Sequence, residues 1–356
     1  GIEMQIFKVG TYKSAVEPFI ATEMSPANRE QVTAFLHSTW NQIISDIAAS
    51  RSMSTDELNN LADQLMDLKP AEEYIANGLA DTLMYQDEVL SFLKDKMGYE
   101  SDESLNTLSL EDMKNVKRNT PLHKSGNIIA VYYAYGGIDD NTSMEEGIVS
   151  EKVIQDLRKL REDKTVKAVV LRVNSPGGSA YGSEQIWNEV VKLKAEKPVI
   201  VSMGDYAASG GYYISCAADY IVANPTTLTG SIGIFGMVPS MEKLLNDKIG
   251  VHFDVVKTNK MADMGDISRP FNAFESEAMQ NMVNNGYKLF VKRCADGRDL
   301  TVQDIKNIAE GRVWTGIAAM QNGLVDTLGG IQDAINMAAD MAELEKYRVV
   351  EFPKKK

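Results

Sequence analysis

An internal repeat constrains the fold of this chain more than any other feature of its sequence. STDELNNLAD at residues 54–63 matches TVQDIKNIAE at 301–310, an offset of 247 positions (301 less 54). ANGLADTL at residues 76–83 matches QNGLVDTL at 321–328, an offset of 245 (321 less 76). The N-terminal part of the chain therefore corresponds to the back half of a module that appears complete later in the sequence.

This repeat predicts the domain organisation. We expect residues 1–97 to be the C-terminal half of a first α/β module, 98–125 to be a linker, and 126–350 to be a complete module. Because a repeat is normally one structural unit, we also expect the chain to be an N-terminally truncated piece of a longer, duplicated protein.

Buried strands and amphipathic helices alternate in the complete module. Four apolar runs have strand length: IIAVYYA (128–134), AVVLRVN (168–174), PVIVSM (198–203) and YIVAN (220–224). EKVIQDLRKLRED (151–163) and SEQIWNEVVKLKAEK (183–197) have the apolar spacing of helices. Such alternation predicts an α/β fold with a mostly parallel sheet and flanking helices. In the half module, Pro26 and a Ser54–Glu57 capping box predict two helix starts.

Charge and apolar content narrow the class of protein. The net charge is −13, from 37 Lys and Arg against 50 Asp and Glu, which argues against a nucleic-acid partner. No run of 18 apolar residues is present, so we expect this chain to be soluble, with any membrane anchor outside it. Cys216 and Cys294 stand in apolar, helix-like contexts and are expected to be buried small residues, not a disulfide.

Two glycine-rich loops follow two of the predicted strands. In GDYAASGGYYIS (204–215), Ser209 has two alanines before it and two glycines after it, and a helix is predicted to begin at this serine. In VNSPGGS (173–179), consecutive glycines allow backbone N–H groups to point outward. Two N–H donors close to a serine oxygen are what an acyl-transfer enzyme needs for its oxyanion. We expect Gly178 and Gly210 to be the donors, with Gly177 as the alternative to Gly178.

Other interpretations of these loops remain open at this point. Each loop could be an ordinary structural turn, with Ser209 as a helix cap. Neither a dinucleotide fingerprint nor a GxxxxGK[ST] phosphate loop is present, and the GxSxG elbow is missed because Ala207 replaces its first glycine.

The base that would activate Ser209 can be a histidine or a lysine. The three histidines, His37, His123 and His252, all lie outside glycine-bordered loops. A lysine can serve if it is neutral, although only about one lysine in a thousand is unprotonated at pH 7.4 at its ordinary pKa. Burial away from carboxylates can supply the required fall in pKa.

Five stretches of the sequence together carry a resemblance to a known family. They are KVGTYKSAVEPF (8–19), VLRVNSPGGSA (170–180), MGDYAASGGYYIS (203–215), ANPTTLTGSIGIFG (223–236) and GRVWTGIAAMQNGLVDTLGG (311–330). In this order they resemble the signal peptide peptidase A (protease IV) family in its long, duplicated form. The resemblance implies a Clp-protease/crotonase-like fold and a serine peptidase with a Ser-Lys dyad.

The resemblance also assigns roles to residues of this chain. It implies that Ser209 is the nucleophile, that Lys13 from the first module is the general base, and that Ser231 orients the lysine. The repeat offers a competitor, because an offset of 247 aligns Lys13 with Lys260, and short relatives take the lysine from the serine's own module. No metal or cofactor is implied.

The function implied by the resemblance is ATP-independent cleavage of signal peptides and similar apolar peptides. The resemblance further implies a homo-oligomer, a ring or bowl of four subunits, anchored in a bacterial cytoplasmic membrane with its catalytic part on the extracytoplasmic (periplasmic) side. A catalytically silent scaffold or holdase of the same fold is an alternative. So is a crotonase-type acyl-CoA enzyme, which would leave Ser209 and Lys13 without a role.

Overall fold

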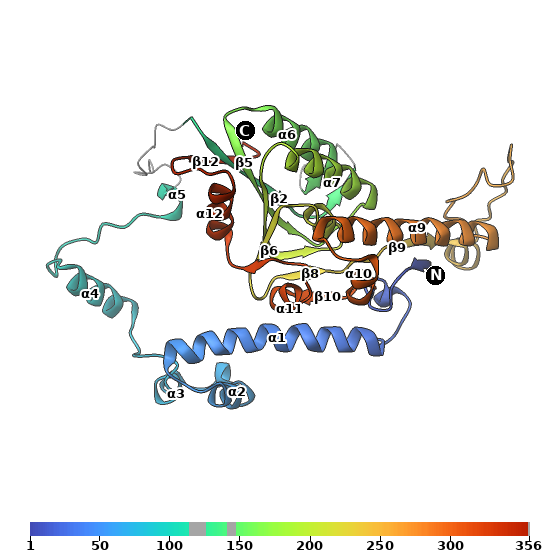
Figure 1. Cartoon of the computed structure of the whole chain (residues 1–356). Helices are drawn as coiled ribbons and strands as arrows, with labels where there is room; N and C mark the ends of the chain where they lie inside the picture. Colours follow the sequence, from blue (N-terminus) through green and yellow to red (C-terminus); the bar gives the residue numbers. More distant parts are fainter. Residues whose placement is uncertain (114–125, 141–146, 355–356) are drawn as a thin grey trace. The chain divides into compact units, whose positions relative to one another are not determined.

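A mostly parallel β-sheet forms the centre of the larger of two compact units (Figure 1). The computed structural model describes residues 1–113, 126–140 and 147–354. The strand order is β10-β8-β6-β5-β2-β12, with β7 also paired to β6 and β11 paired to β7. The strands are β2 (Ile128–Tyr135), β5 (Val166–Ser175), β6 (Val199–Ala208), β7 (Tyr220–Ala223), β8 (Leu228–Gly230), β10 (Val313–Thr315), β11 (Thr327–Leu328) and β12 (Arg348–Phe352). Every pairing in this sheet is parallel except that of β10 with β8.

The predicted α/β class is confirmed, and one strand is longer than its sequence pattern indicated. The apolar run that predicts β6 ends at Met203, whereas the strand continues to Ala208, immediately before Ser209. The extension has a partner, because residues 206–208 pair in parallel with residues 228–230 of β8. Backbone pairing therefore carries the strand through GDYAA, which the side-chain pattern alone predicts as a loop.

Each face of the sheet packs on its own helices, as Figure 1 shows. Alternate residues of β5 divide between two cores: Val169, Leu171 and Val173 belong to the larger, and Ala168 and Val170 to the smaller. This follows from the two-residue period of a strand. The larger core receives α6 (Ser150–Glu162), α7 (Ala180–Lys194), α8 (Gly210–Ser215), α9 (Ala273–Arg298), α10 (Val302–Ile308) and α11 (Gly316–Gln321). The smaller core receives α12 (Ile331–Met341).

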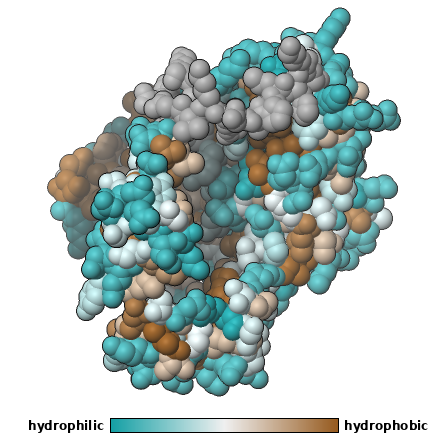
Figure 2. Space-filling model, turned by 90° about the vertical axis from the view of Figure 1, so that its left-hand side faces the viewer, coloured by the Kyte–Doolittle hydropathy of each residue, from teal (hydrophilic) through white to brown (hydrophobic). Residues whose placement is uncertain are grey.

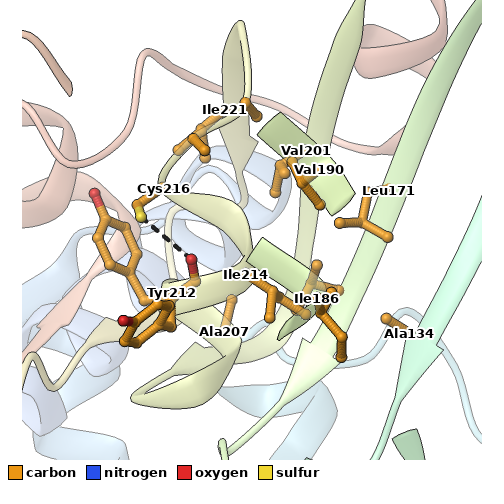
Figure 3. Packing of buried hydrophobic residues seen from close by; sticks show 14 of the residues in the cluster. Ala134, Leu171, Ile186, Val190, Val201, Ala207, Tyr212, Ile214, Cys216 and Ile221 are labelled. Carbon is orange, nitrogen blue, oxygen red and sulfur yellow. Dashed lines mark hydrogen bonds between the residues drawn. The ribbon is translucent and has the colours of Figure 1, made fainter. Parts of the chain in front are cut away.

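The larger core is a closely packed apolar interior. Figure 3 shows Ile186 and Val190 of α7 packed with Leu171 and Val201 of the sheet, and all four are buried. Burial of each aliphatic side chain stabilises the fold by about 1.5–3 kcal/mol. Such contacts hold the carboxyl end of β6, where Ser209 lies, in a fixed place. Cys216 and Cys294 are free, buried members of the same core, as predicted.

The N-terminal segment belongs to the same unit as the sheet. β1 (Glu3–Lys8) pairs antiparallel with β9 (Phe235–Ser240), and a short 3-10 turn, η1 (Glu17–Phe19), follows. Of the described residues, 1–39, 126–140 and 147–354 belong to this compact unit, and 40–113 belong to the other. The module boundaries that the repeat predicts, at residues 97 and 125, stay a prediction; the linker at 98–125 lies partly outside the described residues.

The second unit consists of helices. It contains the end of α1 (Pro26–Arg51), then α2 (Thr55–Asp63), η2 (Met66–Leu68), α3 (Ala71–Ala76), α4 (Gln86–Met97) and α5 (Leu110–Met113). Both predicted helix starts are found: α1 begins at Pro26, and Ser54 caps α2 in a reciprocal capping box with Glu57. α4 buries none of its side chains. Large hydrophobic residues of this unit, such as Leu90 and Phe92, are therefore exposed. Figure 2 shows hydrophobic residues, in brown, among hydrophilic ones on the surface of the protein.

The segment after β9 differs from its pattern. The run VHFDV at residues 251–255, which includes His252, has the alternating apolar pattern of a strand, but residues 251–257 have no regular structure and are exposed. Since no neighbouring strand pairs with this run in the described part of the chain, its apolar alternation does not produce a strand. It follows η3 (Leu244–Ile249). Two short strands, β3 (Ile138–Asp139) and β4 (Ile148–Val149), complete the fold. Among the described residues, no helix combines the length and the hydropathy needed to span a membrane.

Candidate active site

Ser209 occupies a sharp turn between β6 and α8. Its backbone has φ 54° and ψ −118°, a combination that costs a non-glycine residue about 1–3 kcal/mol. The turn is held because the Ser209 N–H donates to the Gly230 carbonyl at 2.9 Å and the Ser209 carbonyl accepts from Tyr213 N–H at 2.9 Å. Such strain is typical of functional positions, and here it presents a half-buried hydroxyl at the carboxyl end of a central strand.

The loop after β5 lies directly against this serine. A Cβ atom added to Gly177 would lie 2.6 Å from Gly210 N and 2.8 Å from Ser209 Cβ, and Gly177 has φ 100°. Only glycine therefore allows the loop to come this close.

Two backbone N–H groups beside Ser209 have no acceptor within the described residues, those of Gly178 and Gly210. Gly178 forms a bridge with Ile138 in which the flanking Gly177 carbonyl and Ser179 N–H make the hydrogen bonds, so its own N–H points away from Ile138. Gly210 is the first residue of α8, where an N–H has no helical partner. The Gly177 N–H, the alternative donor, already donates to Ser175 Oγ at 3.1 Å.

The amine of Lys13 reaches the same place from the N-terminal segment. Lys13 Nζ lies 3.2 Å from Ser209 Oγ, 3.0 Å from Ser231 Oγ and 3.2 Å from the Ser231 carbonyl oxygen. Its side chain is 4% exposed. The structure thus brings together the three side chains that the resemblance named.

The backbone around Lys13 explains this placement. Antiparallel pairing of β1 with β9 is continued by Val9 N–H, which donates to the Ile234 carbonyl, and the chain then turns back toward residue 310. Tyr12 N–H donates to the Glu310 carbonyl at 2.9 Å. A Cβ atom on Gly311 would lie 2.7 Å from Lys13 Cβ, so a glycine is required for Lys13 to pass at this point.

Burial lowers the pKa of Lys13 to about 8 because the charged ammonium form loses its hydration. No carboxylate forms an ion pair with Lys13 in the described part of the chain, so nothing offsets this effect. At pH 8 about half of such an amine is neutral, compared with well under one hundredth at the ordinary lysine pKa. A neutral amine beside a serine hydroxyl can accept its proton.

The other candidate bases lie elsewhere or outside the described residues. Lys260 is exposed, and no hydrogen bond joins it to Ser209 in the described structure. His37, on α1, and His252 are also exposed. His123 lies outside the described residues. No group of His, Cys, Asp or Glu suited to a metal ion occurs among the residues that the structure describes.

Sequence reasoning missed the side chains that fix the glycine loop. Asp140 accepts a hydrogen bond from Ser179 Oγ at 2.6 Å, and Ser179 Oγ accepts from Gly182 N–H as the N-cap of α7. Ser175 Oγ binds the Gly177 N–H. A serine just before a predicted helix is a visible capping signal, whereas the contact of Asp140 spans 39 residues and leaves no local pattern.

Comparison with known proteins shows what the chain is similar to. The model of Peptidase family S49 matches residues 1–100 and 191–345, and the Clp protease model matches residues 131–227. Protease 4 of Salmonella typhi is 39% identical over 98% of this chain and 57% of that protein. The chloroplastic serine protease SPPA of Arabidopsis thaliana is 34% identical over 99% of this chain and 53% of that protein. A putative signal peptide peptidase SppA of Enterococcus faecium is 35% identical over 60% of this chain.

The fold is that of an α/β domain with a mostly parallel sheet, and Ser209 and the buried Lys13 meet at the carboxyl end of β6. Within that class, the chain belongs to Peptidase family S49. It spans a little more than half the length of Protease 4 and of the chloroplastic protease.

Proposed function

We propose that this chain carries the active site of an ATP-independent serine endopeptidase that cleaves apolar peptide segments, cleaved signal peptides among them. The observation that carries the proposal is the 3.2 Å contact between Lys13 Nζ and Ser209 Oγ, made by an amine with its pKa lowered to about 8. The names of the relatives, Protease 4 and signal peptide peptidase, support a peptidase over an acyl-CoA enzyme.

In the proposed mechanism, neutral Lys13 accepts the hydroxyl proton of Ser209 while Oγ attacks the carbonyl carbon of the scissile peptide bond. Ser231 holds the amine in line through two oxygens, its Oγ and its carbonyl. Each of the two N–H bonds of the neutral amine can donate to one of these oxygens. The lone pair of Nζ is then left pointing toward Ser209.

The negative oxygen of the tetrahedral intermediate would bind the free N–H groups of Gly178 and Gly210. Collapse of the intermediate breaks the C–N bond, and the Lys13 ammonium gives its proton to the leaving amine. A water molecule then attacks the acyl-enzyme while Lys13 accepts its proton; the bond between Oγ and the acyl carbon breaks, Lys13 returns the proton to Ser209 Oγ, and the acid product leaves. The chemistry calls for no metal or cofactor.

We further propose, from the resemblance, that the whole protein is a homo-oligomer tied to a bacterial membrane with this domain on the extracytoplasmic side. The hydrophobic side chains exposed in both units support an assembly with further subunits or segments. The partners we propose are peptide substrates, and the net charge of −13 argues against nucleic acid as a partner.

The test is peptide hydrolysis combined with covalent labelling. A fluorogenic apolar peptide and a serine-directed fluorophosphonate are offered to the wild type and to Ser209→Ala, with Ser240→Ala, a buried serine away from Lys13, as matched control. We expect turnover and labelling in the wild type and in Ser240→Ala, and neither in Ser209→Ala. Labelling or turnover that survives in Ser209→Ala would refute the proposal, and their absence in the wild type would support a silent scaffold.

A further inference from the structure

One side chain of α1 bridges the lysine segment and the edge of the sheet. Gln31 is 2% exposed, and all of its amide is used. Its Nε2 donates to the Tyr12 carbonyl at 2.9 Å and to Ser14 Oγ at 3.0 Å, and its Oε1 accepts from Val313 N–H at 3.1 Å. Tyr12 and Ser14 are the two neighbours of Lys13, so Gln31 holds the segment on both sides of the lysine without touching the amine.

A second side chain, that of Arg312, also holds the same segment. The guanidinium of Arg312 lies between two aromatic rings, with its Cζ 4.7 Å from the ring centre of Tyr12 and 4.4 Å from that of Trp314. It also donates to Tyr12 Oη at 3.3 Å and pairs with Glu30 at 3.0 Å. Its Nε is buried without an acceptor among the described residues, which is the cost of this sandwich.

The backbone of Arg312 connects this arrangement to the partner of the lysine. The Arg312 carbonyl accepts from Ser231 N–H at 2.7 Å, and Gly311 N–H donates to the Ile232 carbonyl at 2.9 Å. Arg312 therefore fixes both the segment that carries Lys13, through Tyr12, and Ser231, which binds the lysine amine.

We propose that Gln31 and Arg312 are positioning residues that keep the Lys13 segment closed against Ser231 and so exclude water from the lysine amine. The proposal rests on the proposed function, because it gives the lysine base its environment. No hydrogen bond joins either residue to Ser209 or to the amine in the described structure: Gln31 acts through Tyr12 and Ser14, and Arg312 acts through Tyr12 and Ser231.

The charged groups around the Lys13 segment determine in which direction the pKa of Lys13 changes if the segment opens. The charged or titratable groups close to it are Lys8, Tyr12, Glu17, Glu30, Glu310 and Arg312. None of them forms an ion pair with Lys13 within the described chain, and burial is what lowers its pKa. If the segment opens, water reaches the ammonium form and the pKa of Lys13 rises.

The experiment measures that pKa directly. The protein is labelled with ¹³Cε-lysine, and the resonance of Lys13, identified by its loss in Lys13→Met, is followed by NMR from pH 6 to pH 11 (the range about the two pKa values). The variants are Gln31→Met, which keeps the shape and removes the hydrogen bonds, and Arg312→Lys, which keeps the charge and removes the planar stack.

Matched controls separate positioning from loss of stability. Gln5 also exchanges two hydrogen bonds with a backbone, at Phe271, and lies on β1 away from Lys13. Arg293 also stacks on a tryptophan, with Cζ 3.8 Å from the Trp187 ring centre. Gln5→Met and Arg293→Lys therefore remove the same kinds of interaction elsewhere.

We expect the midpoint of Lys13 to rise by about one pH unit in Gln31→Met and in Arg312→Lys and to stay near 8 in both controls. The low-pH side of the profile of kcat/KM should move by the same amount, about a tenfold loss at pH 7 that is recovered at higher pH. If Gln31→Met does not fold, Arg312→Lys decides by the same readout.

An unchanged midpoint in both folded variants would overturn the proposal, as would an equal rise in the controls. The failure of the proposed function is a separate result: peptide turnover would then persist in Lys13→Met. In that case the NMR midpoint still decides whether Gln31 and Arg312 keep the amine dry.

Discussion

The amine of Lys13 lies 3.2 Å from the hydroxyl oxygen of Ser209, although 196 residues separate the two in the chain. The N-terminal segment thus completes a site whose other residues follow the strands of the central sheet. The lysine is buried, has two further oxygens of Ser231 around it and faces the Phe235 ring, whose centre lies 5.9 Å from Nζ.

The rate of hydrolysis should depend on pH through Lys13. Since the amine must be neutral to accept a proton and its pKa is about 8, kcat/KM should rise tenfold per pH unit below that value and level off above it. A rate profile of the wild type between pH 6 and pH 10 checks this. A profile that rises only near the ordinary lysine pKa would contradict it.

Folding stability should also report the buried lysine. A lysine with a lowered folded pKa binds fewer protons folded than unfolded between pH 8 and 10.5, so its contribution to stability rises with pH across that window. Below pH 8 the full penalty, roughly 3 kcal/mol, is present. Lys13→Met should therefore be more stable than the wild type at pH 7, and the difference should shrink by pH 10.5. Urea unfolding at both pH values measures it; an advantage independent of pH would refute this assignment.

Gly177→Ala should abolish most of the activity. The new Cβ would lie 2.6 Å from Gly210 N, so the loop must move away from Ser209 and take the proposed oxyanion donor with it. Loss of such a donor costs about a hundredfold in kcat. Gly250→Ala is the matched control, because Gly250 also has a positive φ but nothing within 4 Å of its Cβ position. Equal losses of activity in the two variants would point to backbone strain in place of loop displacement.

Ser231→Ala should reduce kcat moderately, by about tenfold, with KM little changed. The variant loses the Oγ acceptor at 3.0 Å, but the carbonyl of the same residue still holds the amine at 3.2 Å. Steady-state kinetics with the fluorogenic peptide tests this, again with Ser240→Ala as control. A loss as large as that of Ser209→Ala would mean that Ser231 takes part in the chemistry itself.

Local patterns predicted most of the sheet and the position of Ser209. The apolar runs of β2, β5, β6 and β7 are visible because a strand buried on both faces must be apolar along its length. The end of β6 could not be predicted from the sequence, because residues 206–208 extend the strand by pairing with β8 and carry no apolar strand pattern of their own.

The choice of lysine shows where sequence reasoning ends. Lys13 and Lys260 occupy equivalent positions in the repeat, and only the resemblance separated them. Physically, β1 pairs with β9 and carries Lys13 inward, whereas the segment of Lys260 has no strand partner in the described structure and its side chain is exposed. Gln31 and Arg312 were missed for a similar reason, because each acts on residues more than a dozen positions away or across nearly the whole chain.

The most direct test of the account compares peptide hydrolysis by Lys13→Ala and Lys260→Ala with that of the wild type and Ser209→Ala. We expect turnover by Lys13→Ala to fall to the level of Ser209→Ala, while Lys260→Ala retains wild-type turnover. Turnover that survives in Lys13→Ala and is lost in Lys260→Ala would contradict it, because the serine module would then supply its own base.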